Sequence, residues 1–307
     1  MTTLLPQIEH VYQNHTLDST RWERFNPRAN DIVVATPYKS GTTWMQTIVM
    51  YLILQDLQPH SLDDFSSWID ARWNPLEEML THLDAQAHRR CLKSHLPLDA
   101  LLYFPQVKYI VVGRDARDVF MSLWNHYSRH TQEILDILND TAGRVGDPFP
   151  PCPENIRDFW QGWITRGWFD WESEGYPYWS NFHHVQSWWN YRHLPNILLV
   201  HYNDLLTDLS GEIRRIANYL EIEVAPEMLV SIAEAVGFES MKSNAEKIIP
   251  GAEFSWEGGA KTFINKGTNG RWREVLTEDD LKLYEAAVAR ELTPDCATWL
   301  EHGRLSG

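Results

Sequence analysis

"DIVVATPYKSGTTWMQ" (31–46) joins an apolar run to a polar loop and then to a helical pattern. The run 31–35 predicts a buried strand, and apolar residues recur at helical spacing from Trp44 to Ile53. Backbone N–H groups at the start of a helix favour an anion, and a lysine and hydroxyl groups add further donors. The stretch therefore predicts an anion site at a strand-to-helix turn, formed by Lys39, Ser40, Gly41, Thr42 and Thr43.

The loop does not have the spacing of the phosphate loop found in nucleoside triphosphatases. That loop requires G-x-x-x-x-G-K followed by Ser or Thr, and no such string occurs in the chain. Here Lys39 precedes Gly41. Taken alone, the segment leaves open an ordinary Ser/Thr-capped helix with a solvated lysine.

Three further apolar runs, 91–95, 107–113 and 196–202, predict buried strands. Helical patterns separate them, among them 119–127 and a helix over 210–220 with Ser210 as its N-cap. Continuous apolar strands that alternate with amphipathic helices indicate an α/β fold, a central parallel sheet flanked by helices. We expect one domain, 1–307, with its ligands beyond the carboxyl ends of the strands.

The composition narrows the choice of partners. A net charge of −15 argues against nucleic acid and against an anionic membrane surface. No apolar stretch is long enough to span a bilayer, and the N-terminus lacks the pattern of a signal peptide. The three cysteines form no disulfide or zinc pattern. We expect a cytoplasmic protein that acts on a small molecule and requires no metal.

Two other predicted strands end in residues that bind anions or carry protons. Arg114 follows the run 107–113, and Ser122 lies about two turns along the next helix. A guanidinium at this position suits bidentate binding of a phosphate. Lys93 and His95, at the end of the run 91–95, have equal parity, so both side chains can point to one side of the sheet.

Four segments resemble motifs of the cytosolic sulfotransferase family. "TPYKSGTTW" is similar to T-Y-P-K-S-G-T-T-W, with Pro37 and Tyr38 exchanged, and "KSHLP" is similar to K-T-H-L-P. "RDARDVFMS" fits R-x-x-x-D-V-x-x-S, and "NKGTNGRW" fits R-K-G-x-x-G-x-W except that Asn265 replaces the first arginine. The segments follow in the family's order from residue 36 to residue 272.

The resemblance implies a bacterial-type sulfotransferase with a fold like that of the P-loop NTPases. Its donor would be 3′-phosphoadenosine 5′-phosphosulfate (PAPS), and its product adenosine 3′,5′-bisphosphate (PAP). His95 would accept the proton of the acceptor, and Lys39 would stabilise the negative charge on the bridging oxygen as the S–O bond breaks. Lys93 would either stabilise the sulfuryl oxygens or orient the acceptor. Contacts to the nucleotide would come from Lys39, Ser40, Gly41, Thr42, Thr43, Trp44, Arg114, Ser122, Tyr202, Phe238, Asn265, Lys266 and Gly267. Asn265, and Val236 in place of a threonine, imply weaker nucleotide binding.

The acceptor is less defined by the sequence. Seven of the fifteen tryptophans lie in 158–189, which indicates either core packing or an apolar pocket, and we expect a lid over 131–189. This favours a hydrophobic or aromatic acceptor, with a lipid or carbohydrate hydroxyl as the alternative. A nucleotide kinase and a non-catalytic binding protein are the rival classes. For His126 and His130 a solvated helix face is favoured over a metal pair, and both a monomer and a homodimer stay open.

Overall fold

The computed structural model describes residues 5–140 and 142–305, so the predicted domain of 1–307 extends beyond the described part at both ends. Five parallel strands form one sheet in the order β2-β3-β1-β4-β5. Their bounds are β1 Ile32–Ala35, β2 Ser66–Trp68, β3 Cys91–Ser94, β4 Lys108–Gly113 and β5 Ile197–His201. The predicted α/β class with a central parallel sheet is therefore confirmed.

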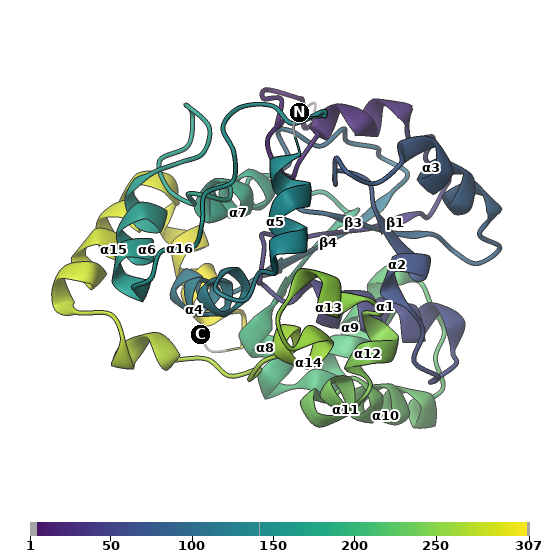
Figure 1. The fold of residues 1–307 in the computed structure, drawn as a ribbon. Coiled ribbons are helices and arrows are strands. Elements are labelled where there is room, and N and C mark those ends of the chain that lie inside the picture. Colours follow the sequence, from purple (N-terminus) through teal and green to yellow (C-terminus); the bar gives the residue numbers. More distant parts are fainter. Residues whose placement is uncertain (1–4, 141, 306–307) are drawn as a thin grey trace.

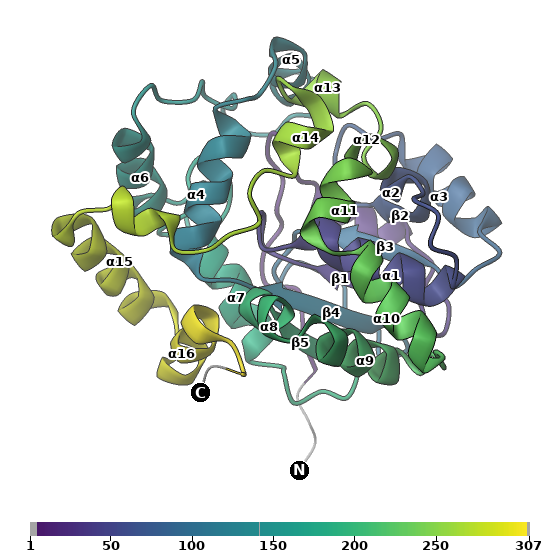
Figure 2. The same cartoon turned by 90° about the horizontal axis from the view of Figure 1, so that it is seen from below.

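Helices cover both faces of the sheet (Figures 1 and 2). Alternate strand residues point to opposite faces, so Val33 and Val111 enter one core while Val34 and Val112 enter the other. The first core includes α4 Ala116–Tyr127, α6 Ile156–Thr165, α7 Asn181–Trp189, α15 Glu278–Glu291 and α16 Pro294–His302. The second includes α1 Thr42–Leu54, α2 Leu62–Phe65, α9 Leu209–Leu220, α10 Pro226–Ala235, α11 Phe238–Ser243 and α12 Ala245–Ile248.

The remaining elements are short or lie at the margins of the two layers. They are η1 Ser19–Arg24, α3 Leu76–Ala85, α5 Gln132–Asn139, α8 Tyr202–Thr207, α13 Ala252–Ser255, α14 Gly259–Phe263 and η2 Arg271–Glu274. Among the described residues, no helix is long and apolar enough to cross a membrane.

All four predicted strands are present, but β2 was not predicted. Its sequence, "SSW", offers no apolar run, and it pairs only at the edge of the sheet, with β3. The predicted N-cap Ser210 is wrong. Helix α9 begins at Leu209, and the side chain of Asp208 accepts the N–H of Gly211, because a carboxylate at this position satisfies an otherwise free helix donor.

The Gly-rich segment 250–272 folds back over the carboxyl ends of the strands. Its helix α13 lies beside α5 (Figures 1 and 2). The N–H of Thr131 donates to the carbonyl of Ser255 at 3.2 Å, and His130 and Trp256 form an antiparallel bridge. Two segments far apart in the sequence thus form one wall above the sheet.

Candidate active site

A cavity of about 820 Å³ is lined by residues that follow β1, β2, β3, β4 and β5 at their carboxyl ends. This volume is within the range of small-molecule sites. Fourteen of the fifteen predicted site residues line it: Lys39, Gly41, Thr42, Thr43, Trp44, Lys93, His95, Arg114, Ser122, Tyr202, Phe238, Asn265, Lys266 and Gly267. The fifteenth, Ser40, is fully buried next to the cavity lining, and its hydroxyl lies 3.5 Å from the carbonyl of Tyr38.

The loop after β1 has an unusual backbone. Lys39 and Gly41 both have positive φ, +59° and +109°. A Cβ at Gly41 would lie 3.1 Å from the ring of Tyr202, so both the turn and the close approach favour glycine. Gly41 is the N-cap of α1 and provides no side-chain cap. The first N–H groups of α1 are therefore suited to an anion.

Tyr38 explains the exchange of proline and tyrosine in this loop. Its buried ring packs at 5.2 Å from Tyr178 and 5.3 Å from Trp179, and its hydroxyl accepts the indole N–H of Trp163 at 2.9 Å. The loop is thus anchored to the aromatic segment 158–189 by a side chain that proline could not replace.

Lys39 is surrounded by aromatic rings and by other cations. Its Nζ lies 3.3 Å from His126 Nδ1 and 4.1 Å from the centre of the Phe263 ring. Burial, followed by the positive charges of Lys93 and Arg114, lowers the pKa of Lys39 to about 7. An anion in the cavity would offset this repulsion and restore the charge of the lysine.

The solvated face favoured for His126 and His130 is wrong. Both histidines line the cavity, and burial, followed by the charge of Lys39, lowers the pKa of each. The periodicity of α4 did not indicate this face, because the wall that encloses it, with Trp256 and Phe263, comes much later in the chain.

His95 is held in a defined tautomer. Its Nδ1 lies 2.7 Å from the carbonyl oxygen of Thr36, which can only accept, so Nδ1 carries the proton and Nε2 is free to accept one. Its backbone N–H donates to the carboxylate of Asp70 at 3.0 Å. Burial and then the charge of Lys93 hold the pKa of His95 well below its usual value, so the ring is neutral near pH 7.

Lys93 lies beside His95, as their equal parity predicts. Its Nζ stands 4.0 Å over the ring of Trp68, and burial lowers its pKa to about 8. The fully buried Asp70 also accepts the indole N–H of Trp68 at 2.8 Å, so one carboxylate positions both the histidine and this tryptophan. No sequence pattern indicated that Asp70 or Trp68 belongs to the site.

The other end of the cavity carries the predicted nucleotide contacts. Arg114 stacks 4.1 Å over the ring of Tyr202. Its Nε and Nη2 donate to the Asn269 side chain at 3.0 and 2.7 Å, and its Nη1 donates to the carbonyl of Lys39 at 3.2 Å. Trp44 donates its indole N–H to the carbonyl of Val236 at 2.9 Å. Arg114 and Trp44 thus both pack on the ring of Tyr202, and their role in binding a nucleotide stays a prediction.

The aromatic segment contributes two residues to the cavity, Tyr178 and Trp179. Trp160, Trp163 and Trp188 lie fully buried in the core. Helix α5, also inside 131–189, adds Ile134, Ile137 and Leu138 to the lining. A lid over 131–189 stays a prediction.

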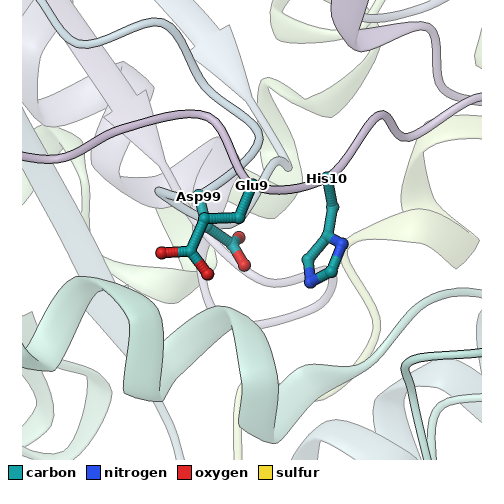
Figure 3. Close-up of side chains that lie close together, drawn as sticks. All are labelled: Glu9, His10 and Asp99. Atoms are coloured by element: carbon teal, nitrogen blue, oxygen red, sulfur yellow. The ribbon is translucent and has the colours of Figure 1, made fainter.

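One group of three potential metal ligands occurs among the described residues. Glu9, His10 and Asp99 place ligand atoms within 4.8 Å of one another (Figure 3). None of them lines the cavity, Glu9 is exposed, and the ring of His10 stacks on Trp171 at 4.5 Å.

Comparisons with known proteins agree on one family. The profile of the sulfotransferase domain matches residues 29–294. A glycolipid sulfotransferase of Mycobacterium bovis is 32% identical over 96% of this chain and 94% of its own length. Human sulfotransferase 2B1 is 29% identical over 86% of this chain and 67% of its own length. A crystal structure of retinol dehydratase with androsterone and the inactive cofactor PAP covers 90% of this chain and 84% of its own, with a TM-score of 0.69 and 26% identity.

Proposed function

Because the chain belongs to the sulfotransferase domain family, we propose that this cavity moves the sulfuryl group of PAPS to a hydroxyl of an amphiphilic, sugar-bearing acceptor. The observation that carries the proposal is one cavity of about 820 Å³ that is lined by several cations, the N-terminus of α1 and a neutral histidine, together with apolar and polar residues that suit an acceptor.

The chemistry assigns one role to each central residue. His95 Nε2 takes the proton of the acceptor hydroxyl as the new O–S bond forms. Lys39 and the start of α1 stabilise the charge that develops on the 5′-phosphate as its O–S bond breaks, and PAP leaves. Lys93, whose charge acts on His95, balances the charge of the sulfuryl oxygens in this proposal.

The acceptor part of the cavity has two chemically different walls. One is apolar and is built by α5 with the segment around α13 and α14, through Ile134, Ile137, Phe254, Trp256 and Phe263. The other combines two tryptophans with polar groups, namely Trp68, Trp73, Asp63, Asn74 and Glu78. Indole faces and side chains that accept hydrogen bonds suit a ring bearing hydroxyl groups, whereas the apolar wall suits an alkyl chain.

The relatives support an acceptor of mixed character. Two further mycobacterial relatives, like the one above, are named glycolipid sulfotransferases, at 32% identity over 96% of this chain. The polar wall also favours a sugar over a simple phenol, because the exposed Asp63 and Glu78 could accept hydrogen bonds from several sugar hydroxyl groups, whereas a simple phenol offers one.

An acceptor panel tests this proposal. We expect an alkyl glycoside to give a higher kcat/KM than its free sugar or a simple phenol, with sulfated products followed by mass spectrometry. Trp73→Ala should raise the KM for the glycoside about tenfold, as the loss of a buried aromatic contact would. Trp171→Ala is the matched control, since Trp171 is 39% exposed and does not line the cavity. A phenol that is preferred over the glycoside would contradict the proposed acceptor class.

A further inference from the structure

The end of the cavity where we place the nucleotide contains one guanidinium that the family pattern does not explain. Arg271 lines the same cavity as Arg114 and Ser122. It opens η2, directly after Gly270, whose φ of +84° turns the chain. The N–H of Gly270 donates to the carboxylate of Asp118 on α4 at 2.7 Å. Arg271 is thereby fixed close to the start of the helix that carries Ser122.

The hydrogen bonds of Arg271 are incomplete. Its Nε is buried and has no partner among the described residues, and no ion pair of Arg271 occurs among them. Burial and the nearby charge of Arg114 both lower the pKa of Arg271. The carboxylate of Asp118 lies near both guanidinium groups and offsets part of their repulsion, and a doubly charged anion between them would be stabilised by both.

The other groups expected at this end of the cavity are less able to bind a phosphate. Asn265 is neutral, so its side chain can donate to a phosphate but cannot balance the charge of one. Lys266 is exposed. Arg114 already makes four hydrogen bonds, two to the side chain of Asn269 and one each to the carbonyls of Lys39 and Thr268. The side chain with a free, buried donor is that of Arg271.

We propose that Arg271 binds the 3′-phosphate of the nucleotide together with Arg114, and so supplies the guanidinium that position 265 lacks. The inference rests on the proposed function, because it takes PAPS as the donor. Nucleotide selection then depends on a residue six positions beyond the one where the family pattern has its arginine. The neutral Asn265 need not weaken nucleotide binding.

The test compares two nucleotides that differ in the 3′-phosphate. Binding of PAP and of adenosine 5′-monophosphate is measured by calorimetry for the wild type, Arg271→Ala, Arg271→Lys and Arg273→Ala. We expect Arg271→Ala to weaken PAP binding about 10- to 100-fold, since a charge-assisted contact is lost, and to leave the monophosphate affinity unchanged. Arg271→Lys should keep part of the PAP affinity, because it retains the charge without the fork.

Arg273→Ala is the matched control. Arg273 lies on the same short helix, is exposed, and stacks 4.6 Å over Trp272 without lining the cavity. It should leave the affinity for both nucleotides unchanged. Equal loss of PAP and monophosphate affinity in Arg271→Ala, or no loss of either, would overturn the inference. If the wild type binds PAP no better than the monophosphate, this inference fails alone, whereas a wild type that binds neither overturns the proposed function as well.

Discussion

Replacing His95 by alanine is expected to lower turnover by about 10²- to 10⁴-fold, the range that a positioned general base contributes. PAP should bind to the variant as it does to the wild type, because we propose that Nε2 contacts the acceptor and not the nucleotide. Single-turnover transfer, with PAP affinity measured in parallel, separates the two effects. His95→Asn keeps an N–H for the carbonyl of Thr36 and should be equally slow.

The pH dependence of the transfer rate is a second test of His95 as the base. The base must be neutral to accept a proton, and the pKa of His95 lies well below its ordinary 6.5. The rate should therefore not fall through protonation of His95 between pH 8 and about pH 6. Turnover in His95→Ala that is comparable to the wild type would remove the residue from the base role.

Lys39→Met should lower both the rate and the affinity for PAP, the rate by about 10²- to 10³-fold, as the loss of one charge-stabilising donor does elsewhere. In the free protein the pKa of Lys39 is about 7, because of burial and then its cationic neighbours. Bound phosphate raises this pKa. PAP affinity should thus be highest below pH 7 and fall as the pH rises toward the pKa of the complex.

Calorimetry in two buffers of different ionisation enthalpy measures the protons involved. The wild type should take up protons on binding PAP near pH 8, and Lys39→Met should take up fewer, with the remainder due to Lys93, whose pKa is about 8. If the Lys39→Met variant kept both its rate and its proton uptake, the loop would be an ordinary capped helix and not an anion site.

The sequence was sufficient for the layers of the fold and for the residues at the strand ends. Runs such as 107–113 are apolar throughout, which is how a strand covered on both faces must be built. The anion loop and His95 follow directly from such runs, so their positions relative to the sheet could be derived before the structure. Strand β2 was not predicted, because it is short and polar and lies at the edge of the sheet.

Other parts of the site depend on contacts that no local pattern contains. His126 faces the cavity only because α14 and Trp256 return to cover it. Tyr38 is explained by Trp163, Tyr178 and Trp179, which are distant in the chain. The high number of tryptophans in 158–189 does not show which of them lie in the core and which line the cavity. Trp160 is buried and Trp179 lines the cavity, although both are apolar and lie in the same segment.

A crystal structure with PAP and an alkyl glycoside would test the assignment of this site most directly. We predict the 5′-phosphate at the start of α1 next to Lys39, and the 3′-phosphate near Arg114, Ser122 and Arg271. One hydroxyl of the acceptor should lie about 3 Å from His95 Nε2, within reach for proton transfer. A nucleotide bound away from the loop 36–41, or an acceptor whose hydroxyl groups all lie out of reach of His95, would contradict the account.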